Sequence, residues 1–293
     1  MSTYQATATM PACCHLPHDH RSGEVTAMSD SHEQKVDMSK YFNRRQRVYL
    51  INASENRDHD LYESLSGTIV GRGGDSVAVQ LTYPRDCAHP VGESLNHAYK
   101  LTTEVMGNGI QVIADLLRVE EGSILHLRLR SNLEMYQRRQ APRIDASIHL
   151  SQFQGNNSLD AFRREFDRIS GLMKNRELPP GIRMQETTIN LGVGGIRIAS
   201  ESGTSPSPLS LFLLGLDEGQ LPVCALGDLV WNRLESGARV CGYRFIQISK
   251  TDQERINDYI LSLRKKQKIF TPLPRANWEL MERMVYDGAL WQR

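Results

Sequence analysis

Three arginines lie within six residues of one another, at Arg138, Arg139 and Arg143. The guanidinium group of arginine is planar and permanently charged, and its paired N–H donors fit phosphate oxygens or the edge of a guanine base. Pro142 fixes its own φ and restricts the residue before it, so we expect an extended backbone here. The segment is predicted to be an arm that presents its arginines to one anionic partner; a solvated basic linker is the alternative.

A glycine-rich turn between two strand-like runs, at residues 189–198, is the second candidate element. It contains Asn190, Gly192 and Gly195. Glycine lets a backbone come close to a ligand, and consecutive free N–H groups in such a turn attract an anion. The turn is therefore a second candidate contact for whatever the arm binds.

Together, Arg139-x-x-x-Arg143 and Asn190-x-Gly-x-x-Gly195 resemble the two signature motifs of PilZ domains, the bacterial receptors for cyclic di-GMP. The family pattern has a serine where this chain has Gly192. The missing hydroxyl removes a hydrogen bond worth on the order of 1 kcal/mol, or about tenfold in affinity. We expect Gly192→Ser to restore at most that much, provided that the backbone φ of residue 192 is negative.

The resemblance implies cyclic di-GMP as the ligand and a role for each motif residue. Arg139 and Arg143 would bind the phosphates and the guanine edges through charge-assisted hydrogen bonds. Arg138 would add stacking or a further phosphate contact, Asn190 would hydrogen-bond a base, and Gly195 would permit close approach. No cofactor, metal or catalytic residue is implied, and the chain shows no nucleophile elbow, zinc-protease or P-loop pattern of an enzyme.

The overall charge argues against binding through bulk electrostatics. The 293 residues include 35 Lys+Arg and 34 Asp+Glu, which gives a formal net charge of +1. A general DNA, RNA or membrane-surface binder would carry an excess of positive charge, so local clusters must carry any anion binding. Aromatic residues make up only 7% of the chain, and few lie near the arginines, which disfavours a single-stranded nucleic-acid site.

Cysteine usage and apolar run length favour a cytoplasmic protein. The five cysteines are an odd number without a CxxC pair, which indicates neither a disulfide framework nor a zinc ribbon. Cys13, Cys14 and the nearby histidines match no standard zinc spacing. The longest apolar runs, such as Leu209–Leu216, fall far short of the roughly 20 residues that span a bilayer, so we expect no membrane insertion.

The hydrophobic pattern predicts a mainly β protein with two small antiparallel β-barrels or split barrels. Short runs that alternate apolar and polar residues recur between turn signals from about Gln46 to Leu133, with a hairpin candidate at Arg72–Asp75. This half is similar in layout to the N-terminal domain of flagellar-brake proteins. We expect a disordered tail over residues 1–40, a first β-domain over 41–134, a PilZ-like domain over 135–268 and a tail with a short helix over 269–293.

Two helices are predicted in the second domain. Residues 158–173 place apolar side chains at three- and four-residue steps, which indicates an inserted amphipathic helix capped near Asn157 or Ser158. Its apolar face packs either on its own barrel or against a partner, for example in a homodimer. A C-terminal helix begins at about Thr251–Glu254, where the pattern indicates a capping box, and by resemblance to PilZ domains it closes one end of the barrel.

Two functions remain open. The first is a cyclic di-GMP receptor whose arm joins the domains, so that binding selects one interdomain orientation and regulates motility, biofilm or exopolysaccharide output. Its target would be a protein such as the flagellar motor or the polysaccharide machinery. The alternative, suggested by Gly192, is a degenerate PilZ module that acts as an interaction scaffold without nucleotide.

Overall fold

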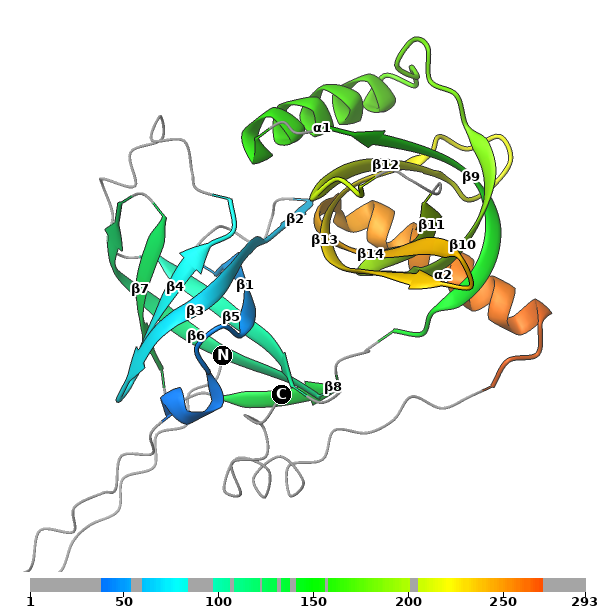
Figure 1. Cartoon of the computed structure of the whole chain (residues 1–293). Coiled ribbons are helices and arrows are strands. Elements are labelled where there is room, and N and C mark those ends of the chain that lie inside the picture. Colours follow the sequence, from blue (N-terminus) through cyan, green and yellow to red (C-terminus); the bar gives the residue numbers. More distant parts are fainter. Residues whose placement is uncertain are drawn as a thin grey trace, which may run out of the picture. The chain divides into compact units, whose positions relative to one another are not determined.

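A computed structural model describes residues 38–53, 60–83, 97–105, 108–121, 123–130, 133–137, 141–155, 158–200 and 205–270 of the chain. Within these residues the strands form two seven-stranded antiparallel sheets, and in each sheet six strands close into a barrel (Figure 1). The predicted mainly β fold with two barrels is therefore confirmed. The tails expected over 1–40 and 269–293 lie outside the described residues except at their inner ends.

The first barrel consists of β1 (Arg47–Asn52), β3 (Leu65–Gly73), β4 (Ser76–Leu81), β5 (Ala98–Val105), β6 (Asn108–Glu120) and β7 (Ile124–Leu129). Its strand order is β5-β1-β3-β4-β7-β6, and a pairing of β5 with β6 closes it; β8 (Glu134–Gln137) adds to β6. The predicted hairpin joins β3 to β4. Gly73 pairs with Ser76 there, and Gly74 has a φ of +57°, which glycine adopts without strain.

The interior of the first barrel is filled from its strands and from the segment that leads into them. In β4, buried and half-buried residues alternate strictly, because successive side chains of a strand point to opposite faces. The short helix η1 (Met38–Tyr41) precedes β1, and Tyr41 and Phe42 pack into the apolar core. The tail boundary expected at residue 40 falls inside η1, since these two aromatic side chains have a core to fill.

The second barrel consists of β9 (Ile144–Gln154), β10 (Gln185–Gly192), β11 (Gly195–Ser200), β12 (Leu209–Gly215), β13 (Val223–Glu235) and β14 (Ala238–Ser249). Its order is β11-β10-β9-β12-β13-β14, closed by a pairing of β11 with β14. The short strand β2 (Leu61–Glu63) pairs with β14 and extends this sheet. The second sheet therefore includes a segment from the range expected for the first domain.

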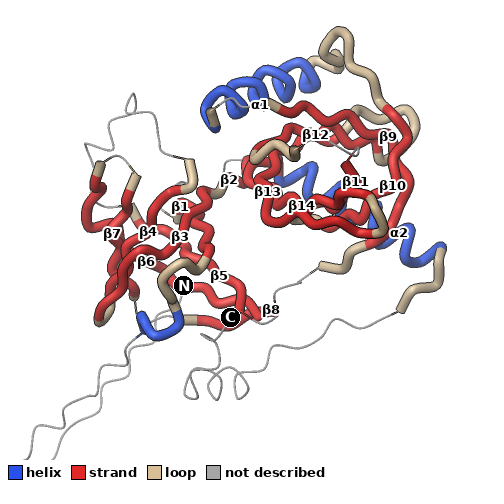
Figure 2. Tube along the Cα trace, in the orientation of Figure 1, coloured by secondary structure: helices blue, strands red, loops and turns tan. Residues whose placement is uncertain are grey.

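Helix α2 (Lys250–Lys266) lies against the second barrel (Figure 2). Its apolar face packs on the core of that barrel, as predicted. Ile256 and Ile260 are fully buried there. The helix is capped by Ser249, whose hydroxyl accepts from the Asp252 N–H at 3.0 Å. The predicted capping box at Thr251–Glu254 is therefore wrong. Ser249 already satisfies the helix N-terminus, and the Thr251 hydroxyl instead donates to an earlier segment of the chain.

Helix α1 (Leu159–Lys174) lies between β9 and β10 in the sequence and packs on the outside of the second barrel. The Ser158 hydroxyl accepts from the Ala161 N–H at 3.3 Å and caps the helix, as predicted. Its buried residues are Leu159, Phe162, Phe166 and Ile169. They pack with Leu209, Leu211, Leu213, Cys224, Leu226 and Ile246 of β12, β13 and β14. The apolar face is thus covered by its own barrel, so a homodimer contact would have to use another face of this helix.

An ion pair joins β1 of the first sheet to β13 of the second. Arg47 donates to Asp228 Oδ2 at 3.1 Å and to two backbone carbonyl oxygens of β13. The Tyr83 hydroxyl donates to Asp228 Oδ1 at 2.8 Å. Burial raises the pKa of the Asp228 carboxyl, and Arg47 opposes that rise. This buried charge therefore has the partners that it needs in order to be tolerated.

Among the described residues, no helix combines the length and the apolar character that crossing a bilayer requires.

Candidate ligand-binding site

The pairing of β9 with β10 brings the two sequence motifs together. Strand β9 begins immediately after Arg143, and its register with β10 places Arg143 beside Gly192. Gly192 pairs with Gly195 across a tight turn between β10 and β11. Arg143 is exposed. The last arginine of the arm and the glycine motif therefore share one edge of the second barrel.

The Arg143 side chain lies directly over Gly192. A Cβ atom at residue 192 would lie 2.9 Å from Arg143 Cγ and 3.2 Å from its Nε. The φ of Gly192 is not in the left-handed region, so the backbone itself would accept a serine. The space that the family's serine side chain would fill is occupied here by the stem of an arginine.

Gly195 meets a different requirement. A Cβ atom at this position would collide with the carbonyl oxygen of Tyr243 and lie 3.2 Å from the Cα of Arg244, both on β14. Backbone atoms cannot move aside cheaply, so glycine is needed for β14 to pair closely with β11. The close approach that Gly195 permits in this structure is that of a neighbouring strand.

Asn190 belongs to a polar row on the outer face of the barrel. The strand register places Asp145 of β9, Asn190 of β10 and Arg197 of β11 side by side. Asn190 Nδ2 donates to Asp145 Oδ1 at 2.9 Å, and Arg197 lies 3.9 Å from the same oxygen. The side-chain carbonyl of Asn190 is still able to accept a hydrogen bond from a ligand. Asp145 and Arg197 are neighbours that sequence reasoning missed, because only the register reveals them.

The same row continues across β14 to β13. Arg197 pairs with Gly242, and Gly242 pairs with Trp231. The Trp231 indole lies on Gly242, where a Cβ atom would collide with it, and the Arg233 guanidinium lies 5.0 Å from the ring centroid. An aromatic ring that covers a glycine of the next strand stabilises a sheet. The outer row thus runs from a carboxylate through an amide and a guanidinium to an aromatic ring.

Arg244 lies opposite Gly195 and contacts residues of the first sheet. Its guanidinium lies 3.7 Å from the ring centroid of Tyr49 and donates to Glu104 Oε1 at 3.3 Å. Burial lowers the pKa of Arg244, but Tyr62, Tyr49 and Glu104 together outweigh burial and raise this pKa above its ordinary value. Arg244 is therefore a charged residue, engaged by a ring and a carboxylate, next to the glycine motif.

Two of the predicted site residues, Arg138 and Arg139, lie outside the described residues. The structure brings Arg143, Gly192 and Gly195 to one edge of the barrel and places Asn190 in the adjoining outer row. The assignment of these side chains to a ligand stays a prediction.

Metal and thiol chemistry find no support in the described part of the chain. There, no group of His, Cys, Asp or Glu is arranged to hold a metal ion. Cys224 and Cys241 are buried thiols without a disulfide partner, and burial raises the pKa of both. A buried thiol with a raised pKa is a poor nucleophile.

The sequence profile of the PilZ domain matches residues 137–262, a range that contains both motifs, all six strands of the second barrel and most of α2. The chain therefore carries a PilZ domain over this range, and the resemblance drawn from the two motifs is confirmed. No curated protein sequence matches the chain.

Several solved structures resemble the chain weakly. MotI (DgrA), an inhibitor of motility from Bacillus subtilis, is 14% identical, with a TM-score of 0.32, and the match covers 78% of this chain and 100% of that one. YcgR from Escherichia coli, solved in complex with c-di-GMP, is 12% identical, with a TM-score of 0.29 and coverage of 76% and 86%. MrkH from K. pneumonia, also solved with c-di-GMP, is 13% identical, with a TM-score of 0.29 and coverage of 76% and 89%. Identification of the domain rests on the sequence profile.

Proposed function

We propose that this protein is a receptor for cyclic di-GMP that acts by binding and not by catalysis. The observation that carries the proposal is the meeting of two PilZ motifs at one edge of a PilZ domain, with Arg143 beside Gly192.

The proposed site binds the ligand through both charged and neutral side chains. Arg139 and Arg143 bind phosphate oxygens or the guanine edge, and Arg138 adds stacking or a further phosphate contact. Asn190 accepts a hydrogen bond from a base through its side-chain carbonyl, and its amide stays on Asp145. The glycines act indirectly, because Gly192 makes room for Arg143 and Gly195 for β14.

Calorimetric titration of the full chain with cyclic di-GMP at a stated salt concentration tests the proposal. We expect a dissociation constant in the micromolar range or tighter, which corresponds to roughly −8 kcal/mol or better. Arg139→Ala and Arg143→Ala should each remove a charge-assisted contact worth about 1.5–3 kcal/mol. Arg128→Ala, on β7 of the first barrel, is the matched control and should bind as the unaltered protein does. Unchanged titrations for both arm variants would mean that the site lies elsewhere.

The arm also lies between the strands of the two barrels in the sequence, which suggests how binding is transmitted. Drawing several arginines onto one anion restricts the path of this connection and so favours one arrangement of the barrels. Arg244, next to the glycine motif and bonded to Glu104, is a contact that such a rearrangement would change. Small-angle scattering profiles should therefore differ between the ligand-free and saturated protein. Superimposable profiles would leave only a local change.

The proposed output is regulation of motility, biofilm or exopolysaccharide production through a protein target. A second candidate function is a scaffold that binds no nucleotide, and the observation that favours it is Gly192, which lacks the serine hydroxyl of the family pattern. The same titration separates the two, since a scaffold would give no heat of binding while keeping its fold.

A further inference from the structure

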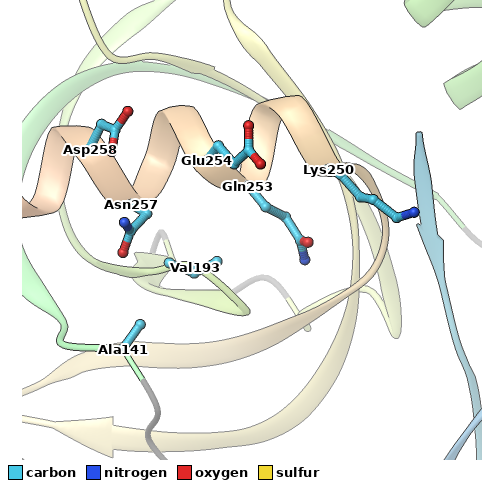
Figure 3. A pocket seen from close by; sticks show the side chains of 7 residues that line it. All are labelled: Ala141, Val193, Lys250, Gln253, Glu254, Asn257 and Asp258. Atoms are coloured by element: carbon cyan, nitrogen blue, oxygen red, sulfur yellow. The ribbon is translucent and has the colours of Figure 1, made fainter. Parts of the chain in front are cut away.

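A cavity of about 530 Å³ opens between the arm, the β10–β11 turn and helix α2 (Figure 3). Ala141 and Val193, which lie within the two motifs, contribute to its lining. The remaining lining residues lie on α2: Lys250, Gln253, Glu254, Asn257 and Asp258. Cavities that hold small ligands have volumes of roughly 300–1,000 Å³. This cavity is thus large enough for part of a ligand and lies next to the proposed site.

Two amide side chains extend from α2 toward the opposite wall. Gln253 and Asn257 are one helical turn apart, and both point toward the side of the cavity where Val193 and Ala141 lie (Figure 3). Neither amide makes a hydrogen bond with another described residue. Each amide can therefore donate and accept hydrogen bonds inside a cavity whose opposite wall is apolar.

The charges around the cavity decide which part of a dinucleotide it suits. Among the residues that line it, Glu254 and Asp258 are carboxylates and Lys250 is a cation, so the net charge of the lining is negative and disfavours a phosphate group. Asparagine and glutamine amides hydrogen-bond to base edges in pairs of contacts, and a flat ring gains from apolar contact on its face. In this proposal the phosphates are bound by the arginines of the arm and not by the cavity.

We propose that this cavity is a nucleobase subsite, in which Gln253 and Asn257 bind the edge of one purine while Val193 and Ala141 contact its face. The inference rests on the proposed cyclic di-GMP function and adds helix α2 to the binding site. It makes α2 a ligand-binding element in addition to its role in the barrel core.

The test compares a double variant, Gln253→Ala with Asn257→Ala, with the unaltered full chain in titrations with cyclic di-GMP at two salt concentrations. Alanine is the best helix former, so α2 should be retained, and a thermal melt checks this. Loss of two neutral hydrogen bonds should weaken binding about tenfold to thirtyfold. The salt dependence should not change, since no charge is removed. Leu261→Ala, on the exposed side of the same helix, is the control and should bind normally.

Three results would contradict the proposed subsite. Affinity within about twofold of the unaltered protein would overturn the subsite while leaving the receptor function intact. Equal weakening by Leu261→Ala, or a salt dependence changed as in Arg143→Ala, would also overturn it, because the effect would then come from the helix or from phosphate contacts. If the unaltered protein binds no cyclic di-GMP, the receptor proposal and the subsite both fall.

Discussion

The two barrels share one strand order and differ in what fills and covers them. Taken in chain order, the six strands of each barrel run first, second, third, sixth, fifth, fourth around its circumference. In the first barrel, the segment before the first strand folds as η1 and places Phe42 in the core. In the second barrel, α2 supplies the additional apolar residues after the last strand, namely Ile256 and Ile260.

The two barrels also differ at the hairpin between their second and third strands. In the first barrel, the segment before the first strand contacts the hairpin between the second and third strands. Arg72 on β3 donates to the carbonyl oxygen of Lys40, in η1, at 3.3 Å. In the second barrel, none of the described residues that lead directly into the first strand, 141–143, belongs to the apolar core. Arg143 is exposed there, beside the corresponding hairpin.

The largest expected effect is on stability. It comes from truncating the core side chain that each barrel receives from a segment outside its six strands. Phe42→Ala should lower the free energy of unfolding by about 3–5 kcal/mol, and Ile256→Ala by about 2–5 kcal/mol, because both side chains are fully buried. Urea unfolding measures the loss, and hydrogen exchange assigns it to a barrel. Phe270→Ala, at an 80% exposed position, is the control. Loss of protection in the second barrel after Phe42→Ala would contradict the division of roles.

The glycines of the two corresponding hairpins should differ in the cost of substitution. Gly195→Ala places a Cβ against the backbone of β14 and should lower the free energy of unfolding by about 1–3 kcal/mol or more. Gly74→Ala meets no atom within 4 Å but requires a positive φ, which costs about 1–2 kcal/mol. Gly194→Ala has neither problem and serves as the control. Denaturant titration measures the loss of stability in each variant. A smaller loss for Gly195→Ala than for Gly74→Ala would show that β14 can move away from β11 at little cost.

The smallest expected effect belongs to Gly192→Ser. The melting temperature should change little, because the colliding neighbour is the flexible side chain of Arg143. Binding of cyclic di-GMP should become weaker by about threefold to tenfold, since the serine moves that arginine from its position. This replaces the modest gain expected from the sequence motif. Calorimetry measures the affinity of Gly192→Ser for cyclic di-GMP, with Gly194→Ser as the control. If Gly192→Ser binds more tightly than the unaltered protein, the family's serine contact is available in this site after all.

Much of the fold could be predicted from local patterns. Alternation over Ile144, Ala146 and Ile148 identifies the buried face of β9, and the period of α1 and its Ser158 cap are visible in the sequence. What covers the apolar face of α1 could not be predicted, because amphipathicity does not name a partner. Gly227 interrupts an apolar run in the sequence, but it lies at a register shift within the single strand β13. The pairing of β2 with β14 has no local signal.

The candidate site, too, could be predicted from the sequence only in part. Its residue types and spacing were visible as motifs, but the position of Arg143 over Gly192 depends on the register between β9 and β10. The row through Asp145 and Arg197 depends on register too. The amides of α2 come from a segment about 60 residues beyond the glycine motif, and only the closed barrel places them near it. Local sequence carries no information on such distant neighbours.

Hydrogen exchange of the full chain with and without saturating cyclic di-GMP tests the central claim most directly. We expect slower exchange at the start of β9, in the β10–β11 hairpin and in the first turns of α2, with no change in the β3–β4 hairpin of the first barrel. Slower exchange confined to the β3–β4 hairpin, or no change anywhere at saturating ligand, would contradict the account.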